Sequence, residues 1–282
     1  SRFSPELVSY AKRGFFVPYQ EKSQSGLTIS DCRGDSLYQF TYPQQLYPTF
    51  VSIPPVVVNS LLFIENRDLL DDKQPLANPA VDWPRFLKAA ISQVAKLVGL
   101  PGQSAGGSTL ATQLEKYRHS PDGLTQSGGE KIRQMISASV RAYQPGPQTL
   151  EARQRVVRDY LNSVPLSAVP GHGEVHGMAE GLRVWYGADF DRTNQLLASP
   201  AKDPKTMTAK GLALREVLSL VIAQRRPSHY LAKGRKELAD LTDSHIRLLA
   251  QNQVIDPPLA DAALGATVTY RDWVQQPTVQ PI

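Results

Sequence analysis

Apolar residues spaced three and four positions apart recur along most of this chain, and this spacing constrains the fold more than any other feature. Such stripes run through residues 87–98, 132–140, 156–164 and 214–222. Each stripe gathers apolar side chains on one face of an α-helix, where they can be buried against other elements. Because this period dominates the chain from residue 56 onward, we predict a mainly α-helical fold.

The two ends of the chain lack this period. Residues 1–55 are irregular, and only two short stretches, 27–30 and 37–41, are typical of β-strands. Residues 265–282 contain Pro277 and Pro281 and favour a terminal strand or linker. We therefore predict an N-terminal segment (1–55) packed on a main helical domain (56–264), followed by a C-terminal segment (265–282).

Composition narrows the class of partner. The chain has 282 residues, a formal net charge of +5 and 41% hydrophobic residues, which is typical of a folded domain. The basic excess suits a phosphate or an acidic membrane surface. No aromatic residues interleave with the basic ones to stack on bases, so we predict no nucleic-acid partner. The single cysteine, Cys32, excludes an internal disulfide and a cysteine-based metal site.

One carboxylate falls on an apolar helix face. The segment 56–70 predicts a helix whose buried stripe includes Glu65, with Val58, Leu61, Leu62 and Leu69. An apolar environment disfavours the ionised form of a carboxyl group, so we expect a raised pKa, which suits a general acid or base. The alternative is a carboxylate at a helix end that pairs with a neighbouring Arg or Lys.

A glycine-rich segment, 102–109, precedes another predicted helix. Ser108 or Thr109 can cap that helix, and a helix N-terminus attracts anions, but no Lys precedes Ser108 as in a Walker loop. The spacing Gly102-x-Ser104-x-Gly106 also fits the nucleophile elbow of serine hydrolases. That elbow requires a strand before it, whereas the preceding residues predict a helix, so a hydrolase with Ser104 as nucleophile is the weaker alternative.

Two histidines, His172 and His176, are four residues apart with Glu174 between them. This spacing could place two metal ligands on one helix face. Glycines interrupt the segment and no third ligand is evident, so we predict a flexible loop and no metal site.

Several segments, taken in order, resemble glycosyltransferase family 51, the transglycosylase domains of class A penicillin-binding proteins. The most specific is Gly-Gly-Ser-Thr-Leu-Ala-Thr-Gln-Leu-Glu-Lys-Tyr at 106–117, beside the family's Gly-Gly-Ser-Thr-Ile-Thr-Gln-Gln-Leu-x-Lys-Asn. The first and third family motifs fall on 64–69 and 130–134. The remaining similarities lie at 160–162, 181–187 and 216–230.

The resemblance implies a lysozyme-like, two-lobed fold with a head and a jaw. It makes Glu65 the general base that takes a proton from the acceptor 4-hydroxyl during inverting transfer from a lipid diphosphate. It assigns the diphosphate to basic residues of the second and third motifs. The substrate-binding residues that it implies are Gly107, Ser108, Thr109, Gln113, Lys116, Lys131, Arg133, Gln134 and Asn162.

The same resemblance implies the surroundings of the domain. Its substrates would be a lipid II type, polyprenyl-diphosphate-linked sugar and a growing glycan chain. Its other partners would be the membrane surface and proteins of cell-envelope synthesis. We expect a periplasmic, extracytoplasmic location with a transmembrane anchor outside this sequence, since no stretch here is long and apolar enough to span a bilayer. A divalent cation at the diphosphate is the one cofactor suggested, although no metal motif is visible.

Some motif positions differ from the family pattern. Asn66 stands where the family has Asp, Gln134 where it has Glu, Glu130 where it has Arg, and Arg158 at an acidic position. These differences leave two alternatives to a polymerase of the usual disaccharide lipid. One is a polymerase for a different lipid-linked sugar, and the other is a catalytically silent domain that binds glycan or lipid-linked sugar as a scaffold.

Overall fold

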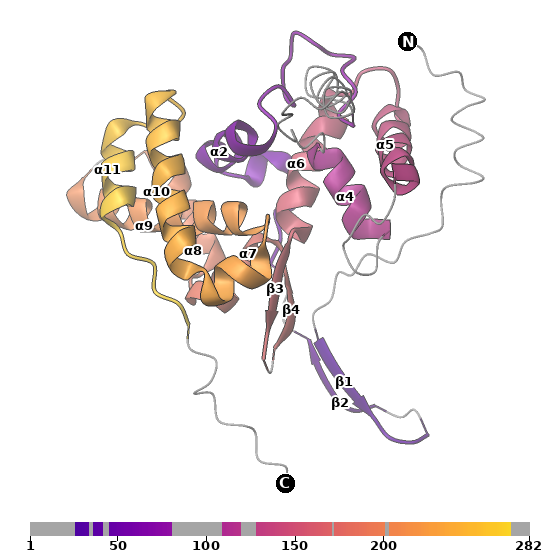
Figure 1. Cartoon of the computed structure of the whole chain (residues 1–282), viewed down its shortest axis with the longest axis horizontal. Coiled ribbons are helices and arrows are strands. Elements are labelled where there is room, and N and C mark those ends of the chain that lie inside the picture. Colours follow the sequence, from indigo (N-terminus) through magenta and orange to yellow (C-terminus); the bar gives the residue numbers. More distant parts are fainter. Residues whose placement is uncertain are drawn as a thin grey trace, which may run out of the picture. The chain divides into compact units, whose positions relative to one another are not determined.

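The computed structural model describes residues 26–33, 36–41, 45–80, 109–119, 128–170, 172–200 and 203–271, and this part of the chain is mainly helical, as predicted (Figure 1). The described chain forms two compact units. Unit 1 contains residues 65–80, 109–119 and 128–159. Unit 2 contains residues 26–33, 36–41, 45–64, 160–170, 172–200 and 203–271.

Unit 1 is built around two long helices and the start of a third. These are α4 (Leu110–His119), α5 (Gly128–Tyr143) and α6 (Leu150–Ser163), of which α6 continues into unit 2. Helices α4 and α5 pack side by side. Ala80, Ala111 and Ala138 form a buried cluster with Val156 against it. Small side chains at this point let the backbones approach closely.

Unit 2 contains two short antiparallel hairpins. The first pairs β1 (Gly26–Ser30) with β2 (Ser36–Thr41), which confirms both strands predicted for the N-terminal segment. The second pairs β3 (Pro165–Val169) with β4 (Gly173–His176). The flexible loop predicted around His172 and His176 is therefore wrong, because backbone pairing between β3 and β4 orders this segment.

Unit 2 also contains helices, several of which pack against α9. Their bounds are η1 (Phe50–Ser52), α2 (Pro55–Glu65), α7 (Gly177–Gly181), η2 (Leu182–Tyr186), α8 (Phe190–Ala198), α9 (Pro204–Ala223), η3 (His229–Lys233), α10 (Arg235–Gln251) and α11 (Pro257–Gly265). Helices α8, α10 and α11 all contact α9. Every residue of α9 from Ala213 to Ala223 is buried, so this helix is the core of the unit.

The local sequence explains where α9 begins. Asp203 caps the helix, since its Oδ1 accepts a hydrogen bond from the Thr206 amide at 3.0 Å. Pro204 occupies the first turn, where no amide donor is needed. The predicted helices at 132–140, 156–164 and 214–222 are confirmed by α5, α6 and α9, whereas the stripe at 87–98 lies outside the described residues.

The chain beyond α11 contacts η2 and α10 within unit 2. The Arg271 amide donates to the Trp185 carbonyl at 2.8 Å, and the Tyr270 ring meets Tyr186 edge-on at 5.3 Å between centroids. The Arg235 guanidinium lies 4.1 Å from the Tyr270 ring centroid. Residues 266–271 form no strand. In the part of the chain that the structure describes, no helix has the length and apolar character needed to span a membrane.

Candidate functional site

Glu65 is the last residue of α2 and is half-buried. Val58, Leu61 and Leu62, which precede it on the same stripe, are buried as predicted. The helix ends earlier than predicted, because the chain turns at Asn66, whose carbonyl accepts from the Leu69 amide at 3.2 Å. The role of Glu65 as general base stays a prediction.

The loop that follows Glu65 is tied to α6 by one buried arginine. Arg153 is only 1% exposed. Its Nη1 donates to the carbonyls of Leu69 and Asp71, and its Nη2 donates to that of Gln74, all at 2.9 Å. Burial lowers the pKa of Arg153, while the charge of Asp71 opposes this shift. The guanidinium therefore fixes the backbone of the loop.

Neighbouring side chains complete this anchorage. Thr149 donates from its amide to the Pro75 carbonyl at 2.9 Å and from its hydroxyl to the Ala77 carbonyl at 2.6 Å. The Tyr143 hydroxyl donates to the Leu76 carbonyl at 2.8 Å. Loop carbonyls outside helices and strands thus accept hydrogen bonds from Tyr143 of α5 and from Thr149, which directly precedes α6.

Thr109 caps α4. Its amide donates to the Thr112 hydroxyl at 2.9 Å, and the Thr112 amide donates back to the Thr109 hydroxyl at 3.3 Å. This reciprocal pair resembles a capping box, and both residues are buried. The predicted substrate role of Thr109 is untested. Gly107 and Ser108 lie outside the described residues.

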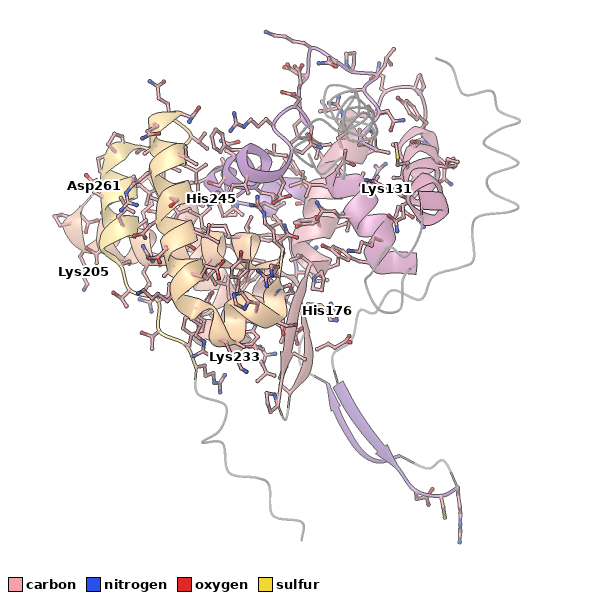
Figure 2. All side chains as sticks on the ribbon, viewed as in Figure 1. Lys131, His176, Lys205, Lys233, His245 and Asp261 are labelled. Carbon is pink, nitrogen blue, oxygen red and sulfur yellow. The ribbon has the colours of Figure 1, made fainter. Side chains whose placement is uncertain are left out.

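The predicted polar and cationic side chains lie on α4 and α5 in unit 1. Gln113 and Lys116 of α4 are half-buried, and Lys131 of α5 is exposed (Figure 2). Gln134 of α5 is 8% exposed. The backbone of Arg133 is part of α5, and its side chain is not among those that the structure describes. Unit 1 therefore holds Glu65 together with the described cations, and the closeness of Glu65 to Lys116 stays a prediction.

A further carboxylate, not predicted from the sequence, lies between α4 and α5. Glu115 accepts a hydrogen bond from the Ser137 hydroxyl at 2.6 Å, and its other oxygen lies 2.7 Å from Nε of Arg141. Its place next to buried Leu114 and four residues after buried Ala111 is the sequence signal that could have found it.

The family model described as Transglycosylase matches residues 33–252, which is most of the chain. The chain belongs to this family. It is a glycosyltransferase family 51 transglycosylase domain, and its helical fold is consistent with the lysozyme-like fold that we predicted. This family is an extracytoplasmic cell-wall enzyme domain with peptidoglycan glycosyltransferase-like function. No curated protein sequence matches the chain.

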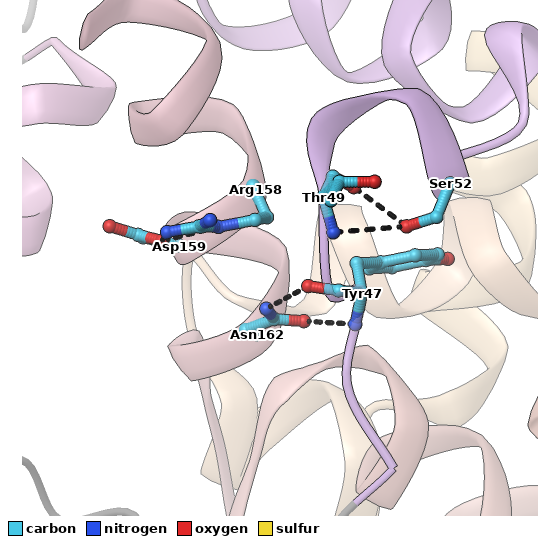
Figure 3. A network of polar contacts seen from close by, with 6 residues as sticks. All are labelled: Tyr47, Thr49, Ser52, Arg158, Asp159 and Asn162. Atoms are coloured by element: carbon cyan, nitrogen blue, oxygen red, sulfur yellow. Dashed lines mark hydrogen bonds and ion pairs between the residues drawn. The ribbon is translucent and has the colours of Figure 1, made fainter.

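Asn162 of this transglycosylase domain has a structural task in unit 2. Its Oδ1 accepts from the Tyr47 amide at 2.9 Å, and its Nδ2 donates to the Tyr47 carbonyl at 3.0 Å (Figure 3). Nearby, the Ser52 hydroxyl donates to the Thr49 carbonyl at 2.6 Å. The side-chain amide of Asn162 thus hydrogen-bonds both backbone groups of Tyr47, as a neighbouring strand would in a β-sheet. The substrate-binding role of Asn162 stays a prediction.

Arg158, which stands at an acidic position of the family pattern, pairs with the residue that follows it. Its Nη2 lies 2.7 Å from Oδ1 of Asp159, and its Nε donates to the same oxygen at 2.9 Å (Figure 3). The domain therefore has a carboxylate, Asp159, directly after the position that is acidic in the family pattern. This carboxylate is paired with Arg158.

The histidines of the β3–β4 hairpin bind different glutamates. His172 Nε2 lies 3.0 Å from Glu180 and His176 Nε2 lies 3.0 Å from Glu174. Within the described ranges, no group of three His, Cys, Asp or Glu side chains could hold a metal ion.

Glu216 of unit 2 is a buried carboxyl group whose pKa is raised. It is 8% exposed in the core helix α9, and burial raises its pKa from 4.5 to about 7. Nearby, the Tyr186 and Ser219 hydroxyls form a hydrogen bond of 2.6 Å. Apolar neighbours on both sides in the sequence, Leu214 and Leu218, were the available signal for its burial.

Proposed function

We propose that this transglycosylase domain polymerises lipid-diphosphate-linked sugars of the lipid II type, with Glu65 as the general base. The observation that carries the proposal is a half-buried glutamate at the position of the family's first motif. It belongs to the same compact unit as α4 and α5, which carry Lys116 and Lys131. One unit thus contains a carboxylate that can take the acceptor proton and cations that can offset the negative charge of the leaving diphosphate.

In the proposed reaction, Glu65 takes the proton of the acceptor 4-hydroxyl. The oxygen of that hydroxyl forms a bond to the anomeric carbon of the donor as the bond from that carbon to the diphosphate oxygen breaks. The polyprenyl diphosphate leaves with the electron pair, and the anomeric configuration inverts. Lys116, Lys131 and Arg133 offset the negative charge that grows on the leaving group.

The partners follow from this chemistry. The donor is a polyprenyl diphosphate that carries the growing glycan chain, and the acceptor is a lipid-linked disaccharide. Both lipids reside in a membrane, so the domain would act at a membrane surface on the periplasmic side. The basic excess of the chain, with a net charge of +5, supports attraction to such an anionic surface.

A polymerisation assay tests the proposal. The purified domain is incubated with a labelled lipid-linked disaccharide, and the products are separated on a gel and analysed for anomeric configuration. The proposal expects a ladder of glycan lengths whose linkages are inverted relative to the donor. Free monosaccharides, or a single product without further growth, would contradict it. A second lipid-linked sugar in a parallel reaction tests the alternative substrate.

A second candidate is a catalytically silent domain that binds glycan or lipid-linked sugar. Gln134 favours this candidate, because a neutral, buried amide stands where the family pattern has a glutamate. The same assay separates the two, since a silent domain would retain the labelled lipid in a binding measurement yet form no ladder. The hydrolase alternative predicts that a fluorophosphonate probe labels Ser104, a residue outside the described ranges.

A further inference from the structure

Glu115 is a buried carboxylate that the proposed mechanism does not use. It is 1% exposed and lies on the inward face of α4 with Ala111 and Thr112. A charged group in such a place is strongly destabilising unless it is paired and hydrogen-bonded. Its surroundings therefore have to supply both kinds of partner.

Helix α5 supplies them. The Ser137 hydroxyl donates to Oε2 of Glu115 at 2.6 Å, and Nε of Arg141 lies 2.7 Å from Oε1. Ser137 and Arg141 are four residues apart, so they share one face of α5. Because each carboxylate oxygen has its own partner, this arrangement fixes the rotation of α5 about its axis as well as its distance from α4.

The same two helices carry the proposed diphosphate-binding residues. Lys116 directly follows Glu115 on α4, and Gln134 lies one turn before Ser137 on α5, with Lys131 one turn earlier. A rotation of either helix would displace these side chains relative to one another.

We propose that Glu115, through Ser137 and Arg141, is a positioning residue that holds Lys116 and Lys131 in the arrangement required to bind a lipid diphosphate. This inference rests on the proposed function, since it assigns the diphosphate to these cations. Glu115 itself is too deeply buried to touch the substrate and acts through the helices that it joins.

The decisive variants remove the charge and keep the volume. Glu115→Gln keeps an acceptor for Ser137 but loses the ion pair, and Arg141→Met removes the other partner. Arg141→Lys keeps the charge and serves as the conservative variant. Glu151→Gln is the matched control, because Glu151 is an exposed carboxylate of unit 1, with 87% of its side chain exposed.

Each variant is compared with the unaltered domain in three measurements. These are urea unfolding, affinity for farnesyl diphosphate as the lipid diphosphate probe, and KM and kcat in polymerisation. All binding and kinetics are measured at a temperature at which every variant is folded. We expect Glu115→Gln and Arg141→Met each to weaken probe affinity about tenfold, with the double variant no weaker than either single variant. KM should rise more than kcat falls, and Arg141→Lys should retain most of the affinity.

Two results would overturn the inference. In one, Glu115→Gln unfolds earlier but binds farnesyl diphosphate as tightly as Glu151→Gln, which would show a purely structural role. In the other, the effects of Glu115→Gln and Arg141→Met simply add. Failure of the unaltered domain to bind the probe would also refute it. Probe binding that depends on Glu115 in a domain that forms no glycan ladder would refute the proposed function and leave the inference standing.

Discussion

Several charged residues of this domain lie at helix positions where the sequence pattern predicts burial in the core. Glu115, Arg153 and Glu216 are each less than a tenth exposed. The sequence shows that such positions lie among apolar neighbours, but it does not show which distant groups meet them. The partners of Arg153, for example, are backbone carbonyls about 80 positions earlier in the chain.

Glu216 should make stability depend on pH. Its pKa is about 7 in the folded domain and 4.5 in the usual case. The folded state therefore holds a proton that the unfolded chain releases, so stability falls as pH rises from about 4.5 to 7 and levels off above. The full effect is roughly 3 kcal/mol. Urea unfolding of Glu216→Gln should show its greatest advantage over the unaltered domain at pH 8 and its least at pH 4.5. An equal difference at both pH values would contradict this assignment.

Arg153 should be far more important for stability than its neighbour on the same helix. Arg153→Met removes three hydrogen bonds to backbone carbonyls, which should cost about 3 kcal/mol at roughly 1 kcal/mol for each hydrogen bond. Arg155→Met is the control, because Arg155 is half-exposed and its pair with Glu151 is long, at 3.9 Å. That change should stay within about 0.5 kcal/mol. Equal losses in urea unfolding would show that the loop does not depend on Arg153.

At the scale of elements, local periodicity predicted the position of helices better than their ends. The stripe that contains Glu65 continues to Leu69, which is buried as a helical residue would be. Leu69 is nevertheless in a turn, and the bond from Arg153 to its carbonyl helps to hold it there. A long-range hydrogen bond thus replaces the helical one, and no local pattern reports such a contact.

The β3–β4 hairpin was missed for a related reason. Glycines and histidines in this segment are typical of loops, and the paired strands have only four or five residues each. The hairpin leads directly into α7 at Gly177, where φ is +76° and the amide donates to the Val164 carbonyl at 2.8 Å. A Cβ atom there would lie 2.3 Å from the Asn162 carbonyl oxygen.

A comparison of Gly177 with Gly187, which follows η2, separates the cost of backbone strain from the cost of a steric clash. Gly187 also has a positive φ, +68°, but a Cβ atom there would meet nothing within 4 Å. Gly187→Ala should therefore cost about 1 kcal/mol, the strain of a left-handed backbone. Gly177→Ala should cost clearly more, roughly 3 kcal/mol, because a backbone carbonyl has to move as well. Thermal or urea unfolding measures both, and similar losses would show that the junction can relax.

At the scale of the whole molecule, the two compact units are interleaved in the sequence. The segment that begins at Glu65 and ends at Asp159 is inserted between two parts of unit 2. The family match at 33–252 spans both units. Composition and periodicity divide a chain only into consecutive segments, and the domain bounds predicted from them, 1–55, 56–264 and 265–282, stay predictions.

The sequence indicated which motif positions belong to the candidate site, but it did not indicate which side chains contact one another there. The family match confirms the resemblance itself, while the site roles that it assigns to Glu65, Lys116 and Lys131 stay predictions. The resemblance gave no reason to examine Glu115, because a charged residue beside a motif lysine is usually solvent-exposed. Only its contacts across to α5 show that this carboxylate joins the two helices.

The most direct test of the central claim is the initial rate of glycan polymerisation by Glu65→Gln, measured beside the unaltered domain and Glu151→Gln. Loss of a general base should lower the rate by a factor of about 100 to 10,000, while affinity for the lipid-linked substrate and the unfolding midpoint stay unchanged. Glu151→Gln should polymerise at the unaltered rate. A Glu65→Gln variant that polymerises as fast as the control would contradict the assignment of Glu65 as the catalytic base.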